Sequence, residues 1–286
     1  MKRPRSSGFT IVEVMIVLAV TGLLFATASS LISGRTDQSE FDQSIRAIQQ
    51  QVQDTVNEVS SGNYTNSGNF QCSGPGGVLT ISSAPKGSVP QGTNYGCIFI
   101  GKAMQFDVNG TTPEQFLTYT LAGLQVLANG QNVTSLATST PLAVAPGTLG
   151  TNSTIPNDTV LGQLEYGLKT VGMTYTSGAV TKTIGAVAFV YNVGSTAGSQ
   201  QYELIPINSS ALNTSMQTTS NAIDSTVAGS GLVGSPADPS GGVTICFASP
   251  GTSQFGILTI GGSNSSNPLG VSISVTSSIK GNPLCA

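Results

Sequence analysis

The sequence predicts an α+β fold: a long N-terminal α-helix packed on a C-terminal, antiparallel, β-rich globular domain. The first observation is a long apolar run followed by apolar residues at helical spacing, which together cover residues 9–61. The second is a change from Tyr64 onward, where short alternating apolar runs are separated by Gly, Pro, Asn and Ser. Such runs predict strands joined by turns.

The N-terminal segment, up to Ile32, has the pattern of a membrane anchor. Three basic residues precede a Gly8-Phe9 junction, and the apolar run that follows carries one charged residue, Glu13. A basic segment before such a run predicts an anchor whose N-terminus stays in the cytoplasm, and about 20 apolar residues suffice to cross a bilayer. In an ordinary secretory signal the small-residue cleavage site follows the apolar core. Here Gly8 precedes the core, so a cut at Gly8 leaves the anchor on the mature chain.

A family resemblance rests on the same residues. The segment Gly8-Phe9-Thr10-Ile11-Val12-Glu13 and the apolar residues 14–20 resemble the cleavage and methylation signature of type IV prepilins and type II secretion pseudopilins. The resemblance implies that a prepilin peptidase cuts between Gly8 and Phe9 and methylates the new amine of Phe9. A generic membrane anchor is the alternative, but it does not explain a carboxylate near the start of the span, where an acid is costly.

Glu13 is the fifth residue of the chain that this cleavage would leave. In a packed bundle of identical helices, the freed amine of Phe9 on an incoming subunit can neutralise Glu13 on its neighbour. Buried charges persist when they are paired. This pair would therefore set the axial register during assembly.

The resemblance implies a structural subunit rather than an enzyme: a pilin, or given the large β domain a minor pilin, of a type IV pilus-like filament. Its expected partners are other pilin subunits, the prepilin peptidase, the pilus assembly platform and the membrane, through residues 9–32. We expect a single-pass inner-membrane protein with a cytoplasmic N-terminus, and then a place in an extracellular pilus on the cell surface. The alternatives are a type II secretion pseudopilin and a membrane-tethered extracellular adhesin or hydrolase.

The predicted organisation has three parts. Residues 1–8 are a leader peptide, residues 9–61 a helix with a transmembrane first half, and residues 62–286 an extracellular head with a possible subdivision near 134–158. Charged residues make up 8% of the chain and hydrophobic residues 38%, with a net charge of −3. This composition favours a β-rich extracellular domain over disorder. It offers no basic patch for nucleic acid.

The four cysteines fit an oxidising compartment. Their spacing is too wide for a zinc site, and four cysteines allow three pairings. We favour Cys72 with Cys97 and Cys246 with Cys285, because each of these pairs closes a local loop.

Residues 35–60 predict an amphipathic helix. Its apolar residues step by three or four positions: Phe41, Ile45, Ile48, Val52, Val56 and Val59. Gly62 suits a left-handed cap. Many pilins carry proline where this chain has Ser30. With weak helix formers among residues 22–34, we expect flexibility there without a proline kink.

The candidate strands share alternating or continuous apolar patterns bounded by turn residues. They are 78–82, 97–100, 104–108, 116–121, 124–128, 171–175, 186–191, 202–207, 243–248, 255–260 and 271–275. Residues 134–158 predict a long loop or a boundary between sheet halves. Residues 211–223 predict a short helix or an irregular excursion.

No motif supports catalysis or a cofactor. Residues 229–234 match a dinucleotide fingerprint in letters, but the prolines that follow oppose the helix this motif needs. The absence of histidine excludes a serine triad of the usual kind, and the acids are scattered. Two oxygen-rich segments, 152–158 and 238–241, lack a recognised calcium spacing and predict Asx-type turns. We therefore predict no catalytic residue, no cofactor and no metal.

Overall fold

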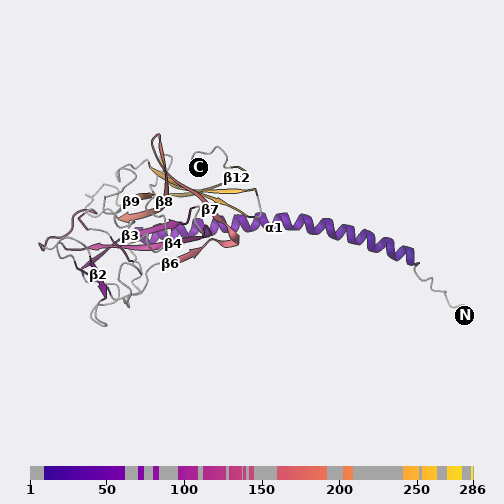
Figure 1. The fold of residues 1–286 in the computed structure, drawn as a ribbon, viewed down its shortest axis with the longest axis horizontal. Helices are drawn as coiled ribbons and strands as arrows, with labels where there is room; N and C mark the ends of the chain where they lie inside the picture. Colours follow the sequence, from indigo (N-terminus) through magenta and orange to yellow (C-terminus); the bar gives the residue numbers. More distant parts are fainter. Residues whose placement is uncertain are drawn as a thin grey trace. The chain divides into compact units, whose positions relative to one another are not determined.

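The computed structural model contains one long helix and an antiparallel β domain, which is the predicted α+β class (Figure 1). It describes residues 10–61, 70–73, 80–83, 96–108, 112–126, 129–136, 138–139, 142–144, 160–191, 202–208, 241–250, 253–262, 269–278 and 285. The chain divides into two compact units, residues 1–43 and residues 44–286, so the helix contributes to both. The predicted boundaries of leader, helix and head stay predictions.

The helix α1 runs without interruption over Ile11–Ser61, a length of 51 residues. It therefore continues through residues 22–34, where the sequence predicts flexibility. The predicted apolar stripe is buried: Phe41, Ile45, Ile48, Val52, Val56 and Val59 are all at most 4% exposed. The predicted cap residue, Gly62, lies outside the described residues.

The strands form two antiparallel sheets. Their bounds are β1 (Phe70–Ser73), β2 (Thr80–Ser83), β3 (Cys97–Phe106), β4 (Gln115–Leu124), β5 (Leu142–Val144), β6 (Val160–Gln163), β7 (Lys169–Ser177), β8 (Val180–Tyr191), β9 (Tyr202–Asn208), β10 (Gly242–Ala248), β11 (Phe255–Gly261) and β12 (Val271–Thr276). Strands β1 and β2 pair alone. In the described part of the chain, the other ten make one sheet in the order β12-β11-β10-β7-β8-β3-β4-β5, with β6 on β4 and β9 on β8.

Two strands that the sequence predicts separately form one continuous strand in the structure. Residues 97–100 and 104–108 were expected as separate strands, but β3 joins them through a register shift between Phe99 and Gly101. A side chain at Gly101 would clash with the carbonyl of Phe189 on β8. Glycine interrupts the apolar pattern here because two backbones approach closely, not because the strand ends.

The predicted loop 134–158 contains a short strand. Strands β5 and β6 pair with the same strand, β4, and follow one another along it: Val144 lies opposite Thr120, and Val160 lies opposite Thr118. Together they make one edge that is interrupted in sequence by residues 145–159, which lie outside the described residues. Four further predicted segments also lie outside the described residues: 211–223, 229–234, 152–158 and 238–240. Their predicted helix, loop and turns stay predictions.

The central strands are buried on both faces. Lys102 on β3 reaches α1, and alternation puts Met104 and Phe106 on the same face of the sheet. The opposite face carries a second apolar cluster, which includes Ala103, Tyr119 and Ala188, all at most 1% exposed. One face of the central strands therefore lies toward α1, and the other face is buried in this second cluster.

Candidate functional site

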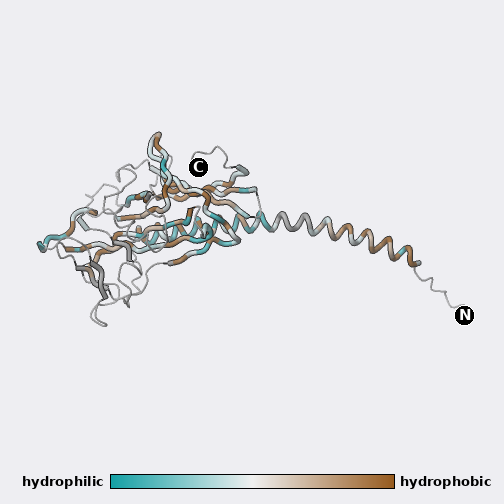
Figure 2. The backbone as a smooth tube through the Cα atoms, in the orientation of Figure 1, coloured by the Kyte–Doolittle hydropathy of each residue, from teal (hydrophilic) through white to brown (hydrophobic). Residues whose placement is uncertain are grey.

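The first part of α1 is an apolar helix that the rest of the chain leaves uncovered. Within the described residues, Ile11–Ser29 is the one helical segment long and apolar enough to cross a membrane, and no part of it is buried. Large apolar side chains point outward, with Ile11 81% and Phe25 77% exposed. Figure 2 shows hydrophobic residues concentrated along this part of α1. A helix that is apolar on every side needs a partner outside its own chain or a lipid surround.

Thr10 begins this helix. Its carbonyl oxygen accepts the first intrahelical bond, from the Val14 N–H at 3.2 Å, and its Oγ1 accepts the N–H of Glu13 at 3.3 Å. These two bonds define an N-cap residue, and Glu13 is the third residue of the helix. Thr-x-x-Glu is the sequence pattern of a capping box, and the bond to the Thr10 hydroxyl is the half of that motif that the structure records here. Gly8 and Phe9, the residues of the predicted cleavage, lie outside the described residues.

The other hydroxyls of the apolar segment are turned back onto the helix. Thr21 donates to the carbonyl of Val17 at 2.8 Å, Thr27 to that of Leu24 at 2.9 Å, and Ser29 to that of Phe25 at 2.9 Å. Hydrocarbon offers no water to which polar groups could hydrogen-bond. These three hydroxyls find their acceptors within the helix instead. Glu13 remains the charged side chain of the segment.

A family model agrees with this segment. Residues 3–29 match the model of the prokaryotic N-terminal methylation motif. The chain carries that motif. The match is consistent with a protein like the type IV prepilins and pseudopilins, and together with the apolar helix it is consistent with membrane anchoring before assembly. No curated protein and no solved structure gives a significant match to the chain.

The motif suggests how the predicted site residues would be used. It implies processing by a prepilin peptidase and assembly with other pilin subunits. The structure places Glu13 in the first turn of α1, on the exposed apolar segment. The sequence analysis missed Thr10. Its signal was present as a Thr three residues before a Glu, ahead of an apolar run.

The second part of α1 is tied to the β domain at both of its ends. Ser44 Oγ donates to the carbonyl of Glu165 at 2.8 Å. Near the helix end, Lys102 on β3 pairs with Glu58, and the hydroxyl of Tyr202 on β9 donates to the Ser60 carbonyl at 2.7 Å. The last carbonyls of a helix lack intrahelical partners. Tyr202 satisfies one of them from the sheet.

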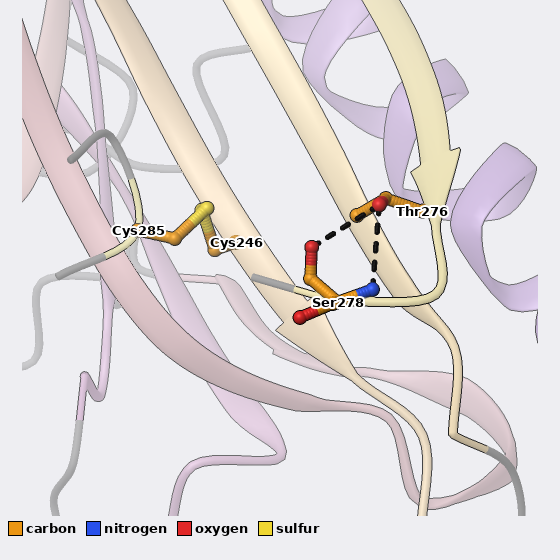
Figure 3. The surroundings of a disulfide bond; sticks show 4 residues. All are labelled: Cys246, Thr276, Ser278 and Cys285. Atoms are coloured by element: carbon orange, nitrogen blue, oxygen red, sulfur yellow. Dashed lines mark hydrogen bonds between the residues drawn. A yellow bond between two sulfur atoms is a disulfide. The ribbon is translucent and has the colours of Figure 1, made fainter. Parts of the chain in front are cut away.

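The disulfides join the pairs that the sequence analysis favours. Cys72 bonds to Cys97 with a Cα–Cα distance of 5.0 Å, and Cys246 bonds to Cys285 at 5.6 Å. Both distances lie in the usual range. Figure 3 shows the second bond together with the turn after β12, where Thr276 and Ser278 are hydrogen-bonded.

Gly172 makes room for the second disulfide. It lies opposite Cys246 in the pairing of β7 with β10. A Cβ at Gly172 would lie 3.1 Å from the carbonyl oxygen of Cys285. The missing side chain lets the C-terminal backbone lie against β7, so the bond fastens residue 285 to the sheet.

One buried polar pair lies on the inner face of β3 and β4. The hydroxyl of Tyr119 donates to Gln105 Oε1 at 3.0 Å inside the apolar cluster, and burial raises the pKa of the Tyr119 hydroxyl well above its usual value. It therefore stays a neutral donor at physiological pH. Over the described residues, no group of three or more His, Cys, Asp or Glu could hold a metal ion.

Proposed function

We propose that this chain is a structural subunit, a pilin or minor pilin, of a type IV pilus-like filament. One observation carries the proposal: the methylation motif of residues 3–29 contains the apolar helical segment Ile11–Ser29, of which no part is buried. A prepilin peptidase would cut after Gly8 and methylate Phe9. The role is structural rather than catalytic.

Before assembly, residues 9–32 hold the subunit in the inner membrane with the N-terminus in the cytoplasm. The assembly platform then moves the subunit into an extracellular filament, where other subunits replace the lipid around the apolar helix. The β domain, closed by two disulfides, becomes the outer surface. Disulfides persist in such oxidising surroundings.

Glu13 gives this assembly its register. The incoming subunit brings the freed amine of Phe9 into an apolar bundle, where an unpaired charge is costly. The carboxylate of Glu13 on the neighbour neutralises it. Removing one member of a buried pair typically costs about 3–5 kcal/mol, and the cost recurs at every subunit contact.

The test is a count of this subunit in sheared surface filaments at equal membrane levels. We expect Glu13→Ala to insert normally but to be lost from filaments, and Glu13→Gln to be intermediate because an amide accepts a hydrogen bond without a charge. Asp42→Ala is the matched control, since Asp42 is an exposed acid on the same helix outside the apolar segment. Wild-type incorporation of Glu13→Ala would refute the proposed mechanism.

A further inference from the structure

The bond between Thr10 and Glu13 bears on two groups in the first turn of α1: the backbone N–H of Glu13 and its side-chain carboxylate. The first four N–H groups of any helix lack intrahelical acceptors, and in hydrocarbon no water replaces them. Thr10 Oγ1 accepts the Glu13 N–H at 3.3 Å. The hydroxyl of Thr10 therefore supplies an acceptor for one of these N–H groups.

We propose that Thr10 is a positioning residue for subunit assembly: its hydroxyl satisfies the Glu13 N–H within the subunit, which leaves the Glu13 carboxylate for the amine of a neighbouring copy. The inference rests on the proposed function. In this role Thr10 acts through Glu13.

The competing arrangement is a carboxylate that folds back onto its own helix. Acids are stabilised near a helix N-terminus by the exposed N–H groups and the helix dipole. Without the Thr10 hydroxyl, we expect the Glu13 carboxylate to turn toward those N–H groups. An incoming ammonium group must then displace it, so incorporation falls even though Glu13 is still present.

The remaining hydroxyls of the segment provide a matched control. Thr21 Oγ1 donates to the Val17 carbonyl at 2.8 Å, an oxygen that the helix ladder already uses. When the Thr21 hydroxyl is removed, every backbone N–H keeps its acceptor. Thr21→Val therefore makes the same chemical change as Thr10→Val at a position away from the helix cap.

The experiment compares Thr10→Val, Thr10→Ser, Thr10→Asn and Thr21→Val in cells that also make the wild-type subunit. The readouts are the filament-to-membrane ratio of each variant, counted per cleaved subunit, and the exchange rate of the Glu13 amide in detergent micelles. Losing an N-cap side chain changes a helix equilibrium about fivefold. We expect a drop in the ratio and a rise in amide exchange of about that size for Thr10→Val alone. Ser and Asn also cap helices, so both should stay within about twofold of wild type.

Three results would overturn the inference. Thr10→Val could match wild type in the filament-to-membrane ratio or in the exchange rate of the Glu13 amide. The exchange rate can be measured even on uncleaved protein. Thr10→Ser and Thr10→Asn could fail as Thr10→Val does, which would assign the effect to side-chain shape. Thr21→Val could fail equally, which would assign it to loss of any hydroxyl. If the wild-type subunit never enters filaments, the proposed function itself fails, and that outcome is distinct from all three.

Discussion

Two parts of one helix behave differently in this protein. In residues 11–29 of α1 no part is buried, and apolar side chains point to all sides. In residues 44–61 the apolar side chains form one stripe that is buried, while Gln50, Asp54 and Asn57 are exposed. Both parts are continuous α-helix. The two parts therefore do not differ in secondary structure. They differ in whether their apolar side chains are buried.

The second part packs within its own unit, whereas no part of residues 11–29 is buried in the described structure. Ser44, Glu58 and Ser60 bond to the β domain, so the C-terminal part of α1 is a structural component of a folded domain. The first part has its own cap at Thr10 and back-bonded hydroxyls. Its apolar surface is exposed. This difference predicts that mutations in the two parts affect different measurements.

The largest effect concerns the leader. Replacing Gly8 with valine should block cleavage entirely, because the peptidase in the proposed function requires a small residue before the cut. The protein should remain in the membrane with its leader attached, as judged by its intact mass. The β domain should unfold at the wild-type urea concentration. A cleaved Gly8→Val chain would contradict the processing scheme.

Breaking the C-terminal disulfide should affect only the second region. Cys246→Ser with Cys285→Ser should lower the free energy of unfolding of the β domain by about 2–4 kcal/mol, measured by urea denaturation of the detergent-solubilised protein. Membrane insertion and cleavage should not change. Reducing agent should destabilise the wild type but not the double variant at this bond. Equal stability of the two oxidised proteins would show that the bond is dispensable.

A pair of valines tests the comparison most evenly. Val52 is 0% exposed and Val17 is 56% exposed. Val52→Ala should cost about 2 kcal/mol of β-domain stability through lost burial and an incomplete collapse of the cavity. Val17→Ala should leave that stability within about 0.5 kcal/mol, the usual range for exposed sites. A similar loss in both variants would mean that the first part also packs on the β domain.

The smallest effect concerns the end of the helix. Tyr202→Phe removes the hydroxyl that bonds to the Ser60 carbonyl and should cost about 0.5–1 kcal/mol. Tyr191→Phe is the control, because the ring of Tyr191 meets that of Tyr202 edge to face with centroids 5.7 Å apart, and among the described residues no hydroxyl bond joins Tyr191 to the helix. The comparison uses unfolding midpoints. If the control loses as much stability, the hydroxyl of Tyr202 does not secure the helix end.

The sequence predicted those features that depend on a single local property, such as residue spacing or loop length. Spacing alone placed Ile45, Ile48 and Val52 on a buried stripe. Loop length alone favoured the cysteine pairing that the structure contains. The strands between residues 171 and 275 were also found, because their apolar runs are bounded by turn residues.

Features that depend on a distant partner were not readable. Gly101 looked like a strand end because its neighbour, the Phe189 carbonyl, lies far away in sequence. Strands β5 and β6 are too short to stand out, and only β4 makes them one edge. Lys102 and Tyr202 meet the helix through tertiary packing. Thr10 is different, since its local signal was available and was overlooked beside the methylation motif.

In the proposed function the mature chain begins at Phe9 and keeps the apolar first part of α1. The most direct measurement is the mass of the N-terminal peptide from the mature protein in membrane and filament fractions. We expect a peptide that starts at Phe9 and carries one added methyl group on its amine. A mature chain that starts after Ala26 or Ser29 would mean that the apolar segment is a removed signal, and the proposed function would be wrong.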